Sequence, residues 1–217
     1  MNRNCISNNA KINSSIYETN SFLIKNQIES EDNNGVSLIE YAAFFGSIQI
    51  IKYLQLQGVE LTSSLWIYAI HSQNAELIHF VEDCHVEPKS TVYKNKKYVV
   101  EISYNGCLNE SIKCNHNAIA DYFLNNYQQN SDEISNDNFI HCLKYYNFAY
   151  MHEEDVNESS FCQICKYDHY LFAYNFLINR DINTIIIQNC IKYNSTSYLS
   201  IIFEIILFNE IQNQIFQ

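Results

Sequence analysis

The stretch SLIEYAAFFGSIQIIKYLQLQG, residues 37–58, decides the fold class, because it carries the start, turn and end signals of two consecutive helices. Ser37 and Glu40 have the spacing of a capping box, in which the hydroxyl accepts from the third backbone N–H and the carboxylate reaches back to the cap residue. Gly46 is placed to adopt the left-handed conformation that ends this helix and turns the chain. The sequence therefore predicts a helix that begins at Ser37 and a tight turn at Gly46.

An apolar stripe with the spacing of one helix face follows this turn, and Gly58 closes it. The stripe consists of Ile48, Ile51 and Leu54, with Ile50 beside them. Ahead of the turn, Ala42 and Ala43 are small enough to let a neighbouring helix approach closely. Residues 37–58 are thus predicted to form one complete helix-turn-helix unit.

This pattern resembles an ankyrin repeat, in which a Gly-x-Thr-Pro-Leu-His-x-Ala-Ala-x-x-Gly-His stretch is followed by an apolar helix and a closing glycine. Leu38 and Glu40 replace the proline and histidine of the family. The chain is also similar to a divergent ankyrin-like domain of unknown function that is expanded in AT-rich protist genomes, and this likeness includes Trp66. The resemblance implies an ankyrin-type stack of helical hairpins and implies no activity. The matching positions are Gly35, Ser37, Ile39, Ala42, Ala43, Gly46, Ile50, Ile51, Leu54 and Gly58.

The scarcity of turn residues restricts both the fold and the enzyme classes. The 217 residues include four glycines and one proline, whereas a β-rich fold needs turn residues roughly every 8–12 positions. We therefore predict an all-α fold. Glycines only at positions 35, 46, 58 and 106 exclude a Walker A loop, a dinucleotide fingerprint and a nucleophile elbow. The chain is accordingly predicted not to be an enzyme and to need no cofactor.

Charge and hydropathy restrict the partners and the compartment. A net charge of −11 argues against nucleic-acid binding, which requires a basic surface. No secretory signal is recognised at the N-terminus, and the most apolar stretch, residues 198–208, is too short to span a bilayer and is interrupted by Glu204. The sequence thus predicts a cytoplasmic, monomeric protein without membrane contact. The eight cysteines are expected to be free thiols in that reducing compartment.

Copies of the unit divide the chain into three predicted regions. Residues 1–33 are expected to form a helical N-terminal cap, residues 34–130 repeats one to three, and residues 131–217 degenerate repeats four to six with a C-terminal cap. The second repeat begins 27 residues after the first, which is short of the ankyrin period of about 33. The β-hairpin fingers of the family are therefore expected to be short or absent, with residues 89–104 as one hairpin-like insertion.

The units are aligned by the residues at their turns. Gln73 in the second repeat, residues 64–78, matches Gly46. Asn115-His116 replaces the Gly-His pair in the third repeat, residues 107–127. The expected fourth to sixth repeats are residues 139–151, 160–177 and 184–208. In the fifth, Ser160 and Gln163 are predicted to form a capping pair, and Asp168-His169 to form the turn.

Two cysteines and a histidine in the fifth repeat form a candidate metal or redox site. Cys162 and Cys165 have zinc-ligand spacing, and His169 follows them. The alignment favours packing, because Cys142, Cys165 and Cys190 fall on the small-residue positions of Ala42 and Ala43. The resemblance implies that His116 and His169 bind backbone with their rings. A metal- or thiol-dependent protein that uses Cys162, Cys165 and His169 stays the alternative.

A second pattern lies at the two residues before each turn. Four lysines share one of these positions, and a tyrosine follows three of them. In an ankyrin stack these positions face the concave side, so the residues would form a Lys-Tyr ladder suited to an acidic peptide or surface. The competing interpretation is that the tyrosines pack between units while the lysines are merely solvated. The predicted contact residues are Tyr41, Phe44, Phe45, Tyr68 and His71 at one end, and Lys113, Lys144, Tyr145, Lys166, Tyr167, Lys192 and Tyr193 along the ladder.

The sequence therefore predicts an all-α, ankyrin-type helical-hairpin solenoid that serves as a non-catalytic protein-protein interaction module. Its partner is expected to be another protein that docks on the concave face. The alternatives are the metal- or thiol-dependent protein, a structural spacer within a larger scaffold, and a helical-hairpin solenoid of another repeat family.

Overall fold

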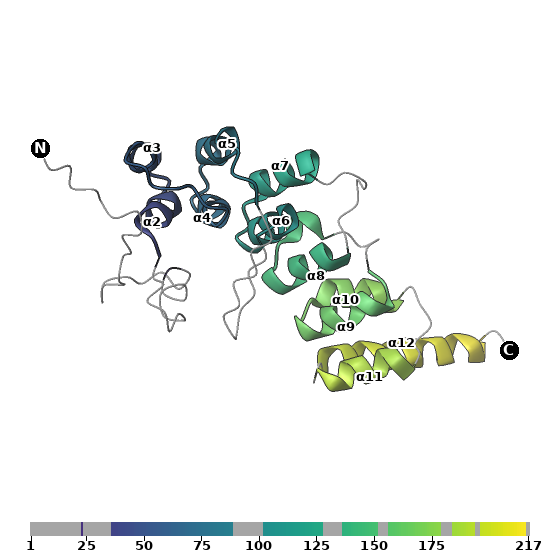
Figure 1. Cartoon of the computed structure of the whole chain (residues 1–217). Helices are drawn as coiled ribbons and strands as arrows, with labels where there is room; N and C mark the ends of the chain where they lie inside the picture. Colours follow the sequence, from purple (N-terminus) through teal and green to yellow (C-terminus); the bar gives the residue numbers. More distant parts are fainter. Residues whose placement is uncertain are drawn as a thin grey trace, which may run out of the picture. The chain divides into compact units, whose positions relative to one another are not determined.

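The computed structural model of the chain describes Leu23 and residues 36–88, 102–127, 136–151, 156–178, 184–193 and 196–215 (Figure 1). Within these residues it contains eleven α-helices and one 3₁₀ helix, and no strand. The predicted all-α class is confirmed. The expected N-terminal cap lies outside the described residues apart from Leu23, as does the expected hairpin-like insertion apart from residues 102–104.

The chain divides into two compact units, Met1–Gln129 and Asn130–Gln217. The first unit contains three helix pairs, and the first helix of each pair also contacts the first helix of the next pair. We call α2, α4 and α6 the stacked helices of this unit. The helices of the three pairs are α2 (Leu38–Phe44) with α3 (Ile48–Leu56), α4 (Leu65–His71) with α5 (Ala75–Asp83), and α6 (Tyr104–Lys113) with α7 (Asn117–Tyr127).

The second unit has its own series of stacked helices, α8 (Asn136–Tyr145), α9 (Glu158–Lys166) and α11 (Thr184–Lys192), each in contact with the next. Helix α9 pairs with α10 (Tyr170–Ile178), and α11 pairs with α12 (Thr196–Ile215). The expected fourth repeat differs from the others. After α8 the described chain forms the 3₁₀ helix η1 (Phe148–Tyr150) in place of an α-helix.

Five stacked helices end in the same left-handed turn. The turn residue has φ between 55° and 64° and is Gly46, Gln73, Asn115, Tyr146 or Asp168. In four of these turns the following N–H donates to the carbonyl five residues earlier, which is the Schellman arrangement. These bonds join Ser47 to Ala42 (2.9 Å), His116 to Ser111 (2.9 Å), Asn147 to Cys142 (3.1 Å) and His169 to Ile164 (3.1 Å). The predicted equivalence of Gln73, Asn115 and Asp168 with Gly46 is confirmed.

The predicted start of the first helix is confirmed, and that of the fifth repeat is wrong. Ser37 caps α2, and its hydroxyl and the Glu40 carboxylate complete the capping box. Helix α9 is capped by Asn157, whose side chain accepts from Ser159 and Ser160, and the reciprocating residue is Ser160. The sequence offers two cap residues one turn apart. The chain uses the earlier one, where the backbone is extended and the Asn157 side chain accepts two backbone N–H groups, and Ser160 is buried inside the helix.

Small residues occupy most of the positions equivalent to Ala42 in the stacked helices. The positions equivalent to Ala42 are all buried and are occupied by Ala42, Ala69, Ser111, Cys142, Ile164 and Cys190. Cys165 lies at the position equivalent to Ala43 and is also buried. In α3, which follows the turn at Gly46, Ile48, Ile51 and Leu54 are buried as predicted. Ile50 is 48% exposed and therefore lies outside the apolar stripe of this helix.

Two histidines tie stacked helices together through the backbone. His116 Nδ1 lies 2.7 Å from the Ile70 carbonyl of α4, and His169 Nε2 lies 2.6 Å from the Leu143 carbonyl of α8. Both acceptors stand three residues before a left-handed turn residue, so the same bond recurs in both units. Each ring nitrogen must donate, because a carbonyl only accepts. The backbone-binding role expected for these two rings is confirmed.

Candidate functional site

The stacked helices of the second unit carry three matching Lys-Tyr pairs at their C-terminal ends. The ammonium nitrogen of Lys144 lies 5.0 Å from the centre of the Tyr145 ring, that of Lys166 lies 5.0 Å from Tyr167, and that of Lys192 lies 5.3 Å from Tyr193. These are cation-π distances. The three lysines are exposed and the three tyrosines are half-buried. Each ring therefore supports a solvated ammonium group.

The pairs belong to helices that contact one another. The Tyr146 hydroxyl donates to the Tyr167 carbonyl at 2.7 Å, which joins the end of α8 to the end of α9. Cys162 Sγ on α9 lies 3.4 Å from the Tyr193 hydroxyl at the end of α11. A lysine is charged at neutral pH by its ordinary pKa, and interaction with the Tyr145 side chain raises the pKa of Lys144 further. The three pairs thus line one end of the stacked helices in this unit.

Charge in this part of the chain is unevenly placed. Residues 130–217 contain eleven acidic residues and four basic ones, namely Lys144, Lys166, Arg180 and Lys192. Three of the four basic residues are therefore the lysines of the pairs. An acidic sequence that gathers its cations at one repeated position presents a local basic surface.

The first unit carries different residues at the same positions. The Phe44 ring stacks on His71 with centroids 5.6 Å apart, and Phe45 is 57% exposed and lies 4.9 Å from the Tyr41 ring. Tyr68 was predicted to contact a partner, but it is 6% exposed. Helix α4 is buried on all sides from Leu65 to Ile70, so Tyr68 is enclosed with the rest of the helix. Tyr68 is therefore no part of an exposed face.

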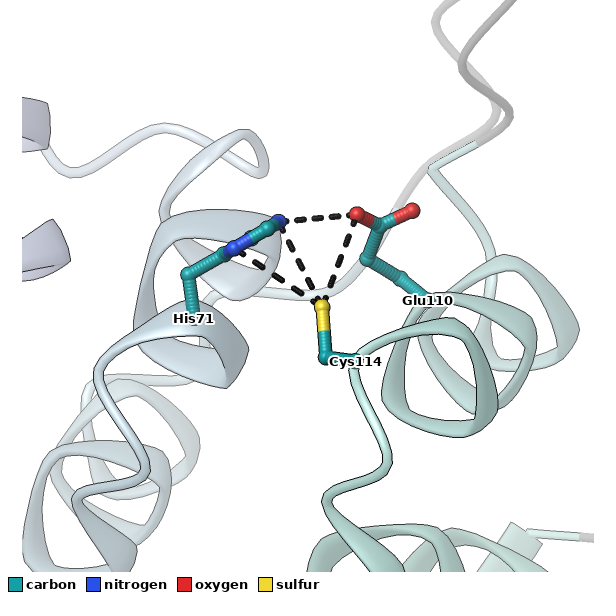
Figure 2. A group of neighbouring side chains, drawn as sticks. All are labelled: His71, Glu110 and Cys114. Atoms are coloured by element: carbon teal, nitrogen blue, oxygen red, sulfur yellow. Dashed lines mark hydrogen bonds and ion pairs between the residues drawn. The ribbon is translucent and has the colours of Figure 1, made fainter. Parts of the chain in front are cut away.

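His71, Glu110 and Cys114 meet at the contact between α4 and α6 (Figure 2). His71 Nε2 lies 2.8 Å from Glu110 Oε1, and Cys114 Sγ lies 3.7 Å from His71 Nδ1 and 3.8 Å from Nε2. Cys114 Sγ lies 4.0 Å from Glu110 Oε1. Lys113 Nζ adds contacts of 2.7 and 2.9 Å to the two Glu110 oxygens. Four chemically different groups thus share one small volume.

This cluster is partly withdrawn from water, and the withdrawal decides its protonation. The His71 and Glu110 side chains are 15% and 12% exposed. Burial by itself would raise the pKa of Glu110, but the hydrogen bond from His71 and the nearby Lys113 ammonium lower it below its ordinary value. Burial and the Glu110 charge raise the pKa of Cys114 to about 12. At neutral pH the cluster therefore holds a carboxylate and a neutral thiol.

The sequence-based interpretation selected His71 and Lys113 but missed Glu110 and Cys114. A local signal existed, because Glu110, Lys113 and Cys114 stand at i, i+3 and i+4 and hence share one face of a helix. The contact with His71 crosses 39 residues to Glu110 and depends on which helices stack.

The alternative metal site is not brought together in the structure. Cys162 contacts Tyr193, Cys165 Sγ lies 3.9 Å from Cys190 Sγ, and His169 binds the Leu143 carbonyl. The contact with Cys190, together with burial, raises the pKa of the Cys165 thiol. Each of the three residues thus has a different partner. Within the part of the chain that the structure describes, the trio with metal-ligand proximity is His71, Glu110 and Cys114.

Comparison of the chain with protein families, curated proteins and solved structures finds no match. Among the described residues, no helix has both the length and the apolar character needed to cross a membrane.

Proposed function

We propose that this chain is an ankyrin-type helical-hairpin solenoid that acts as a non-catalytic protein-protein interaction module, and that the three Lys-Tyr pairs of the second unit bind an acidic peptide segment of another protein. The observation that carries the proposal is the repeated geometry of Lys144, Lys166 and Lys192, each an exposed ammonium above a half-buried tyrosine ring. The proposed compartment is the cytoplasm.

The ankyrin-type stack is supported by what recurs at the turns. The left-handed turn residue and the bond from His116 or His169 to a neighbouring helix reappear at equivalent positions in the two units. Five of the six buried residues equivalent to Ala42 are Ala, Ser or Cys, and side chains this small allow stacked helices to approach closely. A series of helix pairs that repeats its turn and its interface residues is the design of a solenoid.

The Lys-Tyr pairs suit an acidic ligand for two reasons. The rings hold the lysine side chains in a defined place, so less conformational freedom is lost when a carboxylate binds. Tyrosine also contributes contact area and a hydroxyl at low entropy cost. The second unit is otherwise acidic. An anionic segment would therefore be attracted to the surface formed by the Lys-Tyr pairs and repelled by the rest of this unit.

The spacing of the helices indicates what the peptide should look like. Packed helices have axes about 8–10 Å apart, so lysines on successive stacked helices should be separated by a similar distance. A polyproline-II segment rises about 3.1 Å per residue and turns fully every three residues, which puts every third side chain on one face about 9 Å apart. We therefore expect the preferred ligand to carry Asp or Glu at every third position in an extended segment.

The test is fluorescence anisotropy with a labelled peptide that has Glu at every third position and Pro among the remaining residues. A peptide of the same composition with its glutamates adjacent is the comparison. We expect the spaced peptide to bind at least about 10-fold more tightly, and to bind less tightly as salt screens the charges. The triple variant Lys144→Glu, Lys166→Glu, Lys192→Glu should lose this binding.

Lys52→Glu is the matched control, because Lys52 also lies above an aromatic ring, 5.4 Å from the centre of Phe80, but in the first unit. This control should bind the spaced peptide like the wild type. Substitutions of exposed residues usually change the free energy of unfolding by less than about 0.5 kcal/mol, so thermal denaturation should show the triple variant folded, and the same measurement checks the half-buried Lys52 variant. Equal binding of the two peptides, or undiminished binding by the triple variant, would refute the proposed surface.

A further inference from the structure

The cluster of His71, Glu110 and Cys114 offers an imidazole nitrogen, a carboxylate oxygen and a thiol sulfur at one point between α4 and α6 (Figure 2). These three donor types are the ligands that Zn²⁺ takes in proteins. All three ligand atoms lie within 4.8 Å of one another, and all three residues are half-buried. An ion can therefore reach the cluster from solvent and still be partly shielded from it.

The separations of the donor atoms fit a tetrahedral ion. With Zn–S near 2.3 Å and Zn–N and Zn–O near 2.0–2.2 Å, tetrahedral angles put the donors about 3.3–3.6 Å apart. The observed separations are 2.8 Å from Nε2 to Oε1, 3.8 Å from Nε2 to Sγ and 4.0 Å from Oε1 to Sγ. Each differs from the tetrahedral value by about 0.5 Å or less, which small side-chain rotations supply.

We propose that His71, Glu110 and Cys114 form a Zn²⁺-binding site with three protein ligands, Nε2, Oε1 and Sγ, and a fourth position open to water. The ion would replace the hydrogen bond between His71 and Glu110 and would join two stacked helices by coordinate bonds. The site is independent of the peptide surface in the second unit, so either can exist without the other.

Zinc is favoured over other cations by the donor set. Calcium and magnesium require oxygen ligands, and this cluster supplies one carboxylate. A thiolate with an imidazole suits zinc, and the same set accepts Co²⁺, which makes cobalt a spectroscopic probe. Lys113 Nζ contacts Oε2 of Glu110 as well as Oε1, so it can keep orienting the carboxylate through Oε2 while Oε1 binds the ion.

Binding must displace the thiol proton. The sulfur binds a metal ion as a thiolate, whereas Cys114 is a thiol at neutral pH, so Zn²⁺ and the thiol yield a Zn–S bond and release H⁺ to the buffer. Glu110 releases no proton, because a glutamate is ionised at neutral pH by its ordinary pKa. We therefore expect release of about one proton per ion at neutral pH and tighter binding as pH rises.

The experiment titrates chelator-treated, reduced full-length protein with Co²⁺ and then with Zn²⁺. The proposal predicts a thiolate-to-cobalt charge-transfer band that saturates at about one ion per chain and disappears when Zn²⁺ displaces cobalt. Isothermal titration of Zn²⁺ in buffers of different ionisation enthalpy measures the protons released. Cys114→Ser and His71→Gln should each weaken Zn²⁺ binding more than about 100-fold, because loss of an outer-shell partner alone costs about 10- to 100-fold.

Two control variants make the result decisive. Cys84 is a half-buried thiol in the same unit, and its sulfur lies 3.6 Å from Gln55 Nε2, so Cys84→Ser should retain the band. Cys162→Ser tests the site suggested by the Cys-x-x-Cys spacing and should also retain it. Absence of the band in the wild-type protein overturns the proposal, as does its loss in Cys162→Ser or its survival in Cys114→Ser. Far-ultraviolet circular dichroism of each variant shows that lost binding is not lost folding, and His71→Gln provides the second test if Cys114→Ser unfolds.

Discussion

The two compact units of this chain share one backbone device and differ in the chemistry placed beside it. In both, a stacked helix ends in a left-handed turn, and a histidine after such a turn binds the carbonyl of a neighbouring helix. Lys-Tyr pairs stand at the C-terminal ends of three stacked helices in the second unit, whereas the first unit has an aromatic pair and a cluster of His71, Glu110, Lys113 and Cys114. The comparison teaches that the stacking geometry restricts the turn, while the residues just before it are free to diverge into separate sites.

The largest expected effect concerns the shared histidine bond. His169 is buried and His116 is half-buried, although both donate to a helix carbonyl. His169→Ala leaves a cavity and an unpaired Leu143 carbonyl, and should lower the free energy of unfolding by about 2–4 kcal/mol. His116→Ala should cost about 1–2 kcal/mol, because water can reach the Ile70 carbonyl more easily. Urea denaturation followed by circular dichroism measures both.

His79→Ala serves as the control for these variants, because the His79 side chain is 58% exposed and contacts the Glu82 carboxylate of its own helix. It should change stability by less than about 0.5 kcal/mol. If His169→Ala costs no more than this control, the recurring bond does not stabilise the stack.

The same histidines predict a pH dependence. Burial lowers the pKa of His116 and of His169, so the folded state favours the neutral rings and the unfolded state binds more protons at mildly acidic pH. Their contribution is present in full above the unfolded pKa of about 6.5 and declines as the pH falls below it. The stability of the double variant His116→Ala, His169→Ala should fall less steeply than that of the wild type between about pH 6.5 and 5.

A smaller effect tests the charged cluster of the first unit. Glu110→Gln replaces a carboxylate that accepts from His71 and Lys113, and should cost about 1–2 kcal/mol at pH 7. Because the pKa of Glu110 is lowered in the folded state, its contribution is present above the unfolded pKa of about 4.3 and is lost as pH falls through the folded value. The difference from wild type should therefore shrink in acid.

Glu204→Gln is the comparison for this variant, since Glu204 is an exposed carboxylate on α12 of the second unit. It should leave stability unchanged within about 0.5 kcal/mol. A Glu110→Gln protein that denatures like Glu204→Gln would mean that the cluster contributes nothing to the stability of the first unit.

The last comparison is between two turns of the stacked helices, one with glycine and one without, and it includes the smallest expected effect. Gly46→Ala should cost about 1–2 kcal/mol, because φ is 64° there and the new Cβ would lie 3.2 Å from Asn74 Nδ2. Gln73→Gly, at φ 55°, should stabilise the chain by about 0.5 kcal/mol, since relief of the left-handed strain outweighs the added freedom of the unfolded chain. Thermal unfolding of the two variants should shift in opposite directions. Shifts in the same direction would show that another contact decides these turns.

Short-range signals in the sequence were enough to predict the first helix pair. The capping box of Ser37 and Glu40, the turn at Gly46 and the apolar stripe of α3 act within a few residues, so their outcome could be predicted without neighbours. The same reasoning chose the wrong cap for α9, because Asn157 and Ser160 are both good cap residues and local spacing does not rank them. The alignment of units also placed the Lys-Tyr pairs at equivalent positions.

The sequence by itself thus determined the all-α class, the positions of the turns and the repeated Lys-Tyr motif, since each depends on backbone preferences and helix periodicity. The tertiary structure decided that Tyr68 is buried and that His71 meets Glu110 and Cys114. The physical reason is that these outcomes depend on which helices stack and in what register. A contact across 39 residues leaves no trace in local spacing.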